Sequence, residues 1–238
     1  MQALAWGLDF FFPPRCPACA RRTACVALCA DCLAAITPAG SPLCPTCGES
    51  FAGSGPDHQC SRCLLRPPHF AQARACALYR HDRSSPLIEA LHRFKYARDI
   101  TLAPVLGEYL AEHCPLPVVH DLLVPVPLDL ARLRWRGFNQ AAALARVVAA
   151  RHRRPLRPMA LRRCRTTPPQ VGLGEEERRR NMAGAFAVRD RAAVRGQTIL
   201  LIDDVMTTGA TVEECAKTLR RAGARRVDVL VLARAADV

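Results

Sequence analysis

The sequence predicts an α/β domain with a parallel sheet, preceded by a small cysteine-rich module. Two observations lead to this prediction. The apolar run Ile199–Ile202 is unbroken, as in a strand that is buried on both faces of a parallel sheet. Four Cys-x-x-Cys pairs lie between Cys16 and Cys63, a spacing that suits tetrahedral zinc sites. We therefore expect residues 1–68 to form the N-terminal segment and zinc module, and residues 69–238 to form the α/β domain.

The composition indicates a globular protein with a strong positive charge. Half of the 238 residues are apolar, which is enough for one ordinary core beside a small module. The formal net charge is +13, and Lys95 and Lys217 are the only lysines among 34 basic residues. Such a surplus predicts affinity for polyanions, including nucleic acid, nucleotides and anionic membrane surfaces. An arginine bias this strong also fits the nucleotide composition of a source genome.

The N-terminal residues argue against secretion. Residues 1–12 lack a basic n-region, and Asp9 interrupts their apolar run, so they make a poor signal peptide. We expect a short amphipathic helix there. No apolar run approaches the roughly 20 residues needed to cross a bilayer, so no stable membrane insertion is expected. A cytoplasmic protein with reduced thiols follows, and metal then explains its cysteines.

The cysteine pairs supply enough ligands for two structural zinc sites of four thiolates each. We expect the first pair to join the second and the third to join the fourth, although spacing alone leaves a cross-braced pairing open. Cys25 is an alternative ligand and His58 a lesser one; redox thiols and buried structural cysteines are the alternatives to zinc. Metal would supply much of the folding free energy of so small a module. The eight expected ligands are Cys16, Cys19, Cys29, Cys32, Cys44, Cys47, Cys60 and Cys63.

Local signals predict the first elements of the α/β domain. Residues 70–79 alternate in the manner of a short strand. Ser85 suits the N-cap, and Pro86 the first position, of the helix that follows. A second helix is expected over residues 102–113. The basic residues of the first helix fit a solvated face about as well as an anion-binding one; these are His92, Arg93, Lys95 and Arg98.

An apolar strand and an arginine-rich loop come next. Residues 121–127 form the strand, whose end Pro125 and Pro127 place in a loop because proline cannot donate to a sheet. The loop over residues 128–137 leads into a helix over residues 139–151. Its arginines, together with the helix N-terminus, suit an anion, unless the loop is merely a solvated basic surface. The arginines are Arg132, Arg134 and Arg136.

Residues 151–191 are the most basic part of the chain, with twelve arginines against four acidic residues. We expect strands over residues 156–161 and 185–188, and a helical turn over residues 175–180. Between them, residues 165–174 form a loop by every breaker signal. Loops of this length in compact domains are often lids.

The stretch that follows Ile202 is the main candidate ligand site. Asp203 and Asp204 stand at the carboxyl end of a strand, where open α/β sheets bind ligands. A Thr- and Gly-containing turn then leads to a helix over residues 212–221, whose N-terminus favours an anion. Carboxylates accept from vicinal hydroxyls or hold a divalent metal through water, so a sugar phosphate is predicted. The alternative is an ordinary strand end and helix cap. A last strand is expected over residues 226–232. The turn residues are Thr207, Thr208, Gly209, Ala210 and Thr211.

This stretch resembles the 5-phosphoribosyl-1-pyrophosphate (PRPP) motif of type I phosphoribosyltransferases, with an apolar strand, two acidic residues, two apolar residues and a Thr/Gly loop. The resemblance implies that Asp203 and Asp204 contact the ribose hydroxyls and that residues 207–211 hold the 5′-phosphate. It also implies that the arginine-rich loop holds pyrophosphate, with Mg²⁺ bound to PRPP. Some purine-salvage members carry Asp where this chain has Thr207, which weakens a purine-salvage interpretation.

The same resemblance implies a flexible loop that closes over the site from residues 165–174. This loop has no lysine, so Arg165, Arg178 or Arg179 would have to neutralise the leaving pyrophosphate. On this basis Arg165 joins Asp203 and Asp204 in the set of expected catalytic residues.

The order of motifs along the chain resembles the ComF family. The resemblance implies a type I phosphoribosyltransferase-like domain behind a double zinc ribbon, in a cytoplasmic protein linked to natural competence. It further implies single-stranded DNA after uptake as a partner, and competence proteins as possible others. The motifs are the four cysteine pairs, Leu-His-Arg-Phe-Lys-Tyr, Val-Pro-Val-Pro, Arg-Gly-Phe-Asn-Gln, Arg-Thr-Thr-Pro-Pro-Gln, Arg-Arg-Asn-Met-Ala-Gly-Ala-Phe and the PRPP-type stretch.

Two function hypotheses follow. The first is a PRPP-binding, phosphoribosyltransferase-type protein whose acceptor the sequence does not name. The alternative is a non-catalytic adaptor that binds single-stranded DNA and keeps the fold as a phosphate cradle. Aromatic residues make up only 5% of the chain, so stacking contacts would be sparse, and Trp135 is the best candidate for one.

Overall fold

The computed structural model describes most of the chain. The expected helix within residues 1–12 and the middle of the expected lid, residues 167–173, lie outside the described residues. Across the described ranges, no helix has the length and apolar character needed to span a membrane. The described residues are 13–79, 85–113, 118–166 and 174–235.

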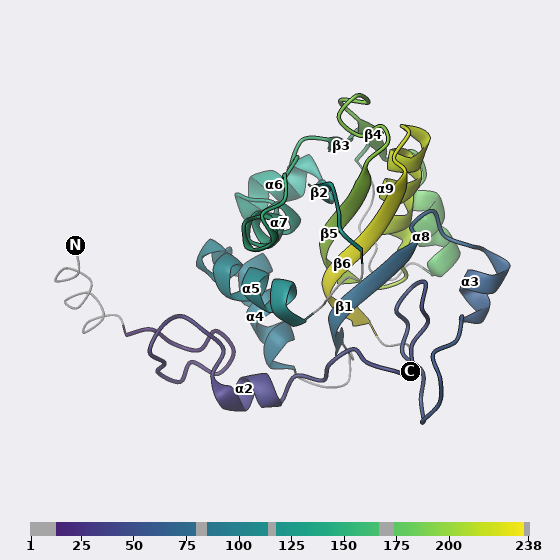
Figure 1. The fold of residues 1–238 in the computed structure, drawn as a ribbon. Helices are drawn as coiled ribbons and strands as arrows, with labels where there is room; N and C mark the ends of the chain where they lie inside the picture. The colour runs from purple at the N-terminus through teal and green to yellow at the C-terminus, as the bar shows by residue number, and fades with distance from the viewer. Residues whose placement is uncertain (1–12, 80–84, 114–117, 167–173, 236–238) are drawn as a thin grey trace.

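A four-stranded parallel sheet forms the centre of the molecule (Figure 1), with the strand order β1-β6-β5-β2. Residues 198–202 of β5 and 227–234 of β6 are buried, which explains the unbroken apolar runs within these two middle strands. The predicted α/β class with a parallel sheet is therefore confirmed. The strands are β1 (Gln72–Tyr79), β2 (Leu122–Pro125), β5 (Thr198–Met206) and β6 (Arg226–Ala235).

Helices cover both faces of this sheet. Leu200 and Ile202 of β5 pack into one buried cluster with α4, α5 and α7. Ile199 and Leu201, which point the other way, pack into a second cluster with α9 and the small antiparallel sheet of β3 and β4. The remaining elements are α2 (Ala30–Ala34), α3 (Ser61–Leu65), α4 (Pro86–Tyr96), η1 (Ile100–Leu102), α5 (Ala103–His113), α6 (Leu130–Arg136), α7 (Gln140–His152), β3 (Leu161–Arg163), α8 (Glu175–Met182), β4 (Phe186–Val188) and α9 (Ala210–Arg221).

The outer edge of β1 is occupied by the segment that links the two cysteine clusters. Leu78 donates its N–H to the carbonyl of Thr37 (3.0 Å), and Ala73 donates to the carbonyl of Thr46 (2.7 Å). Gly48 follows with a φ of +70°, and a Cβ there would lie 2.7 Å from the carbonyl oxygen of Ala73. Only glycine lets the chain approach β1 this closely. The zinc module is thus part of the sheet assembly.

The arginine-rich segment over residues 128–137 was expected to be a loop, and that expectation is wrong. Residues 130–136 form the helix α6. Asp129 caps the helix by accepting from the N–H of Ala131 (3.0 Å), and Gly137 ends it with a φ of +83°. These two flanking residues are local helix signals that outweigh the shortness of the segment.

Two strand boundaries also differ from expectation. β5 does not stop at Ile202 but runs through the carboxylates to Met206, because β6 is long enough to pair with it as far as Arg234. The strand expected over residues 156–161 is reduced to one bridge between Leu156 and Leu123, and β3 begins only at Leu161.

Candidate functional site

Eight of the described cysteines form two clusters that suit zinc. The first and second pairs lie together, as do the third and fourth, and within each cluster the sulfur atoms are within 4.8 Å of one another. The Sγ atoms of Cys19 and Cys29 are 3.6 Å apart, as are those of Cys47 and Cys60. A tetrahedral zinc with bonds of about 2.3 Å places its sulfurs about 3.8 Å apart. Cys25 is exposed and belongs to neither cluster.

Backbone N–H groups favour the thiolate form of one cysteine in each cluster. Cys44 Sγ accepts from the N–H groups of Cys47 (3.5 Å) and Cys60 (3.4 Å). Burial raises the pKa of Cys44, but these hydrogen bonds outweigh burial and lower the pKa to about 7. In the first cluster the same balance lowers the pKa of Cys16 to about 6. One ligand in each cluster is therefore ready to ionise near neutral pH, as zinc requires.

The carboxylate pair lies within β5, half-buried. The Nζ of Lys95, from α4, lies 2.9 Å from Asp204 Oδ1, and each side chain is only 14% exposed. Asp203 Oδ1 accepts from the N–H of Asp204 (2.9 Å). Burial, and next the charge of Asp204, raise the pKa of Asp203 to about 7. The free protein therefore holds two carboxylates close together with one ammonium.

The arginines of α6 differ in their relation to this pair. Arg136 is half-buried and donates to Gln140 Oε1 (2.9 Å). Burial lowers the pKa of Arg136, while the charge of Asp204 raises it, so this guanidinium lies within electrostatic reach of the carboxylates. Arg132 and Arg134 are exposed. The structure thus brings Arg136 to the expected site and leaves Arg134 at the surface.

The Thr/Gly turn joins β5 to α9 in the predicted way. Gly209 is the N-cap of α9, with a φ of +81° and no side-chain cap. Arg178 of α8 donates to Thr207 Oγ1 (3.1 Å), and the N–H of Ala210 lies 3.5 Å from Thr208 Oγ1. The N-terminus of a twelve-residue helix therefore opens beside the carboxylates, an arrangement suited to phosphate. We call residues 207–211 the phosphate loop.

Arg165 has a different environment from the one expected. Its Nη2 donates to the carbonyls of Asn181 (2.7 Å) and Ala183 (2.9 Å), at the end of α8. In the described part of the chain it makes no contact with Asp203 or Asp204. In this structure Arg165 ties β3 to the end of α8.

Sequence reasoning left two cationic partners of the site without a definite role. Lys95 was one basic residue of a helix that fitted a solvated face about as well as an anion-binding one, and Arg178 was one of three arginines considered for neutralising the leaving pyrophosphate. The signal for Lys95 was its rarity, since the chain has only two lysines. Their positions come from contacts across 109 and 29 residues, which local patterns do not encode.

Comparison with known proteins agrees with this arrangement. Residues 7–64 match the double zinc ribbon domain, and residues 116–237 match the phosphoribosyl transferase domain. The chain is 34% identical to the DNA utilization protein YhgH of Escherichia coli K12, covering 87% of this chain and 90% of that one. It is 31% identical to competence protein F of Haemophilus influenzae, over 82% and 85% of the two chains. It is 26% identical to competence protein ComFC of Streptococcus pneumoniae, over 87% of each.

These matches span both the cysteine clusters and the sheet with its carboxylate pair. The chain belongs to the ComF family of competence and DNA-utilization proteins, in which a double zinc ribbon precedes a phosphoribosyl transferase domain.

Proposed function

We propose that this protein binds PRPP, or a related ribose phosphate, together with Mg²⁺, and that it does so in handling single-stranded DNA. The observation that supports this most is the placement of Asp203 and Asp204 beside a helix N-terminus whose N-cap is glycine, on one strand–turn–helix unit. The carboxylates would accept from the ribose 2′- and 3′-hydroxyls, and the phosphate loop would donate to the 5′-phosphate. The names of the relatives suggest the DNA context.

The cations around the site suit the remaining charge of this ligand. Arg136 would face the pyrophosphate, while Lys95 would share Asp204 with the ribose hydroxyls. Bound Mg²⁺ would neutralise further charge on the pyrophosphate. In such a site, transfer displaces pyrophosphate from C1 of the ribose through a cationic transition state, which the nearby carboxylates would stabilise. We place the protein in the cytoplasm, where the eight thiols stay reduced for zinc.

The test is calorimetric titration of Mg²⁺–PRPP into the zinc-loaded protein. We expect micromolar binding by the wild type and roughly tenfold or greater weakening in Asp203→Asn and Asp204→Asn, since each loses a charged acceptor. Asp190→Asn is the matched control, because Asp190 is exposed and caps a distant turn. Equal affinity in all four proteins would show that the site assignment is wrong.

A second function, a single-stranded DNA adaptor, is favoured by an exposed aromatic surface next to the site. The rings of Tyr96 and Trp135 are 59% and 47% exposed, with centroids 6.4 Å apart. The guanidinium of Arg98 lies 4.9 Å from the Trp135 ring, and that of Arg136 lies 5.6 Å from the Tyr96 ring. Exposed aromatic rings beside arginines suit stacked bases and their phosphates. Because Tyr96 directly follows Lys95 in the sequence, one DNA strand could reach both residues.

The adaptor function is tested with labelled oligothymidylate. We expect Trp135→Ala and Tyr96→Ala to weaken DNA binding roughly five- to hundredfold each, as loss of a stacking contact does. Met159→Ala removes a comparably exposed apolar side chain and should leave DNA binding unchanged. Binding should fall steeply with salt. Salt-insensitive binding, or full affinity in both aromatic variants, would exclude this surface.

A further inference from the structure

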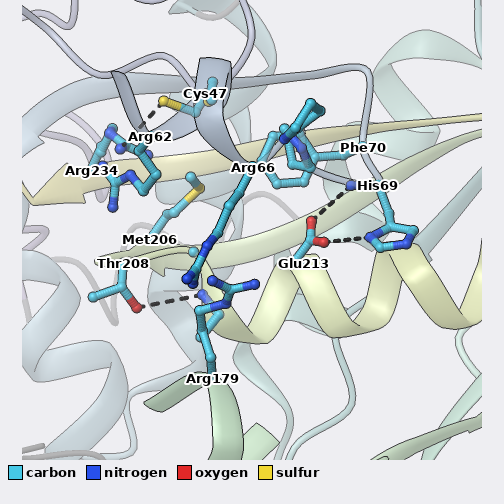
Figure 2. Close-up of a pocket in the computed structure, with 15 residues that line it drawn as sticks. Cys47, Arg62, Arg66, His69, Phe70, Arg179, Met206, Thr208, Glu213 and Arg234 are labelled. Carbon is cyan, nitrogen blue, oxygen red and sulfur yellow. Dashed lines mark hydrogen bonds and ion pairs between the residues drawn. The ribbon is translucent and has the colours of Figure 1, made fainter. Parts of the chain in front are cut away.

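A pocket lies between the second zinc ribbon and the phosphate loop, on the β6 side of β5 (Figure 2). The space between its walls, including solvent at its open mouth, is about 660 Å³. The second ribbon contributes Cys47 and residues 66–70, which follow its last cysteine pair. The α/β domain contributes Met206, Arg234 and residues 208–210. The carboxylate pair, Lys95 and Arg136 are not part of its lining.

Four arginines line this pocket against one carboxylate. They are Arg62, Arg66, Arg179 and Arg234. The carboxylate, Glu213, is already held by His69, through its N–H (2.9 Å) and its Nδ1 (2.5 Å). Arg62 is paired with Glu49 at 2.7 Å, so the excess of positive charge that attracts an anion comes from Arg66, Arg179 and Arg234.

The arginines at the mouth are available for a ligand. Among the described residues, Arg66 pairs with Glu176 alone, at 3.1 Å, and both side chains are 62% exposed. The guanidinium of Arg179 makes no hydrogen bond or ion pair within the described ranges of the chain. Figure 2 shows Arg66 and Arg179 pointing toward one another beside Thr208. Two guanidinium groups that point toward one space match the geometry of a phosphate.

Arg234 is the strongest sign that the pocket is built for an anion. It is 2% exposed, at the end of β6, and its Nη2 lies 3.8 Å from both Cys47 Sγ and Glu49 Oε2. Its Nε and Nη1 have no hydrogen-bond partner among the described residues. Guanidinium groups are rarely buried with so few partners, because the desolvated N–H groups cost free energy. An anion in the pocket would accept hydrogen bonds from Nε and Nη1, which the contacts of Nη2 with Cys47 and Glu49 leave unsatisfied.

The rest of the lining suits a flat organic group. Pro67, Pro68, Phe70 and Met206 give the pocket apolar walls beside its arginines. We propose that this pocket binds a nucleotide through its terminal phosphate, whether the nucleotide is free or stands at the 5′ end of a DNA strand. The site is distinct from the ribose-phosphate site, although the phosphate loop borders both, and its wall includes a zinc ligand.

The test is titration of dTMP and of thymidine into the zinc-loaded full chain. dTMP should bind and thymidine should not, because the arginines recognise the phosphate. Arg66→Gln should weaken dTMP binding roughly tenfold, as the loss of a charge-assisted hydrogen bond does. Arg234→Met should also weaken it, and near-ultraviolet circular dichroism should establish that this variant is folded. Arg151→Gln is the matched control, since Arg151 is an exposed arginine paired with Glu112 on the other side of the molecule.

The variants distinguish the proposed nucleotide pocket from the ribose-phosphate site. Arg66→Gln should keep its affinity for Mg²⁺–PRPP, and Asp203→Asn should keep its affinity for dTMP. Absence of dTMP binding to the wild type would overturn the proposal, as would full dTMP affinity in both arginine variants. One-for-one competition between dTMP and PRPP, with both lost in Arg66→Gln, would also overturn it by merging the pocket with the ribose-phosphate site. A 5′-phosphorylated oligothymidylate that displaces dTMP when its 5′-hydroxyl counterpart does not would identify a strand end as the source of the phosphate.

Discussion

The two zinc ribbons have the same motif but attach to opposite faces of the sheet. In the first ribbon, Cys16 and Cys32 are buried in the cluster that contains α4, α5 and α7, while Cys19 is exposed. In the second ribbon all four cysteines are buried, in the cluster that contains α9. Figure 1 shows the first ribbon beside α4 and the second beside β1 and α8. The ribbons thus support the candidate site from two sides.

Their attachments differ in kind. The first ribbon contacts α4 through a hydrogen bond from Arg93 Nη1 to the carbonyl of Pro17 (2.9 Å). The second ribbon is joined to β1 by the backbone itself, and Cys47 touches Arg234 of β6. The comparison teaches that one metal site is docked on the domain while the other is built into its sheet.

The largest loss of stability is expected from replacing one zinc ligand in each ribbon. Cys44→Ser should lose one zinc and lower the free energy of unfolding by about 4 kcal/mol or more, because zinc supplies the folding free energy of such a site. Cys19→Ser should also lose one zinc but cost about half as much, since its ribbon is only docked. Zinc content by atomic absorption and thermal unfolding measure both. Equal destabilisation would contradict the distinction.

A glycine pair tests the close approach of the second ribbon to β1. Gly48→Ala should lower the unfolding free energy by about 2 to 3 kcal/mol, since its φ is +70° and the new Cβ would lie 2.7 Å from the carbonyl oxygen of Ala73. Gly53→Ala is the control on the same ribbon, with a φ of +91° but open space around the Cβ. It should cost only about 1 kcal/mol in urea unfolding. Similar losses in both variants would mean that backbone strain alone matters.

Lys95 belongs to α4, the helix that the first ribbon contacts, and its effect on Asp203 can be examined through the pH dependence of PRPP binding. The raised pKa of Asp203 means that this carboxyl is protonated below about pH 7 and ionised above it. PRPP affinity should therefore rise as the pH increases through about 7. Lys95→Met should move the midpoint upward by roughly one unit, because the charge of Lys95 lowers the pKa of Asp203. Asp203→Asn lacks the titrating carboxyl group, so the pH dependence of its PRPP affinity reports the titration of PRPP alone. An unchanged or lower midpoint in Lys95→Met would contradict the role of Lys95.

The smallest effect is expected at the docking contact of the first ribbon. Arg93→Ala removes the hydrogen bond to Pro17 and the ion pair with Asp99 (3.2 Å), on a side chain that is 47% exposed. The loss should be about 1 kcal/mol in urea unfolding, with two zinc ions retained. Loss of a zinc ion from this variant would show that the first ribbon depends on α4 to fold.

The sequence predicted the parts of this molecule that local patterns determine. Buried runs predicted the parallel strands and Pro86 predicted the start of α4; the helix expected over residues 139–151 is α7, which Asn139 caps. Sequential pairing of the cysteine knuckles was expected, although spacing alone left a cross-braced pairing open, and the two clusters confirm the sequential one. α6 was missed although its signals were present, because a run of arginines suggested a loop. Long-range contacts were out of reach, since Cys47 and Arg234 meet across 187 residues.

The segment over residues 37–46 has a further consequence. An uncovered strand edge offers its N–H and C=O groups to other chains. This segment runs from the metal site of Cys32 into the metal site of Cys44, and its backbone pairs with β1 at Ala73 and over residues 76–78. Chelation of zinc would release it at both ends and leave β1 open to intermolecular pairing. Chelated protein should then bind thioflavin T, whereas zinc-loaded protein should not. Zinc would in this way protect the folded chain from self-association, beyond holding its ribbons in shape.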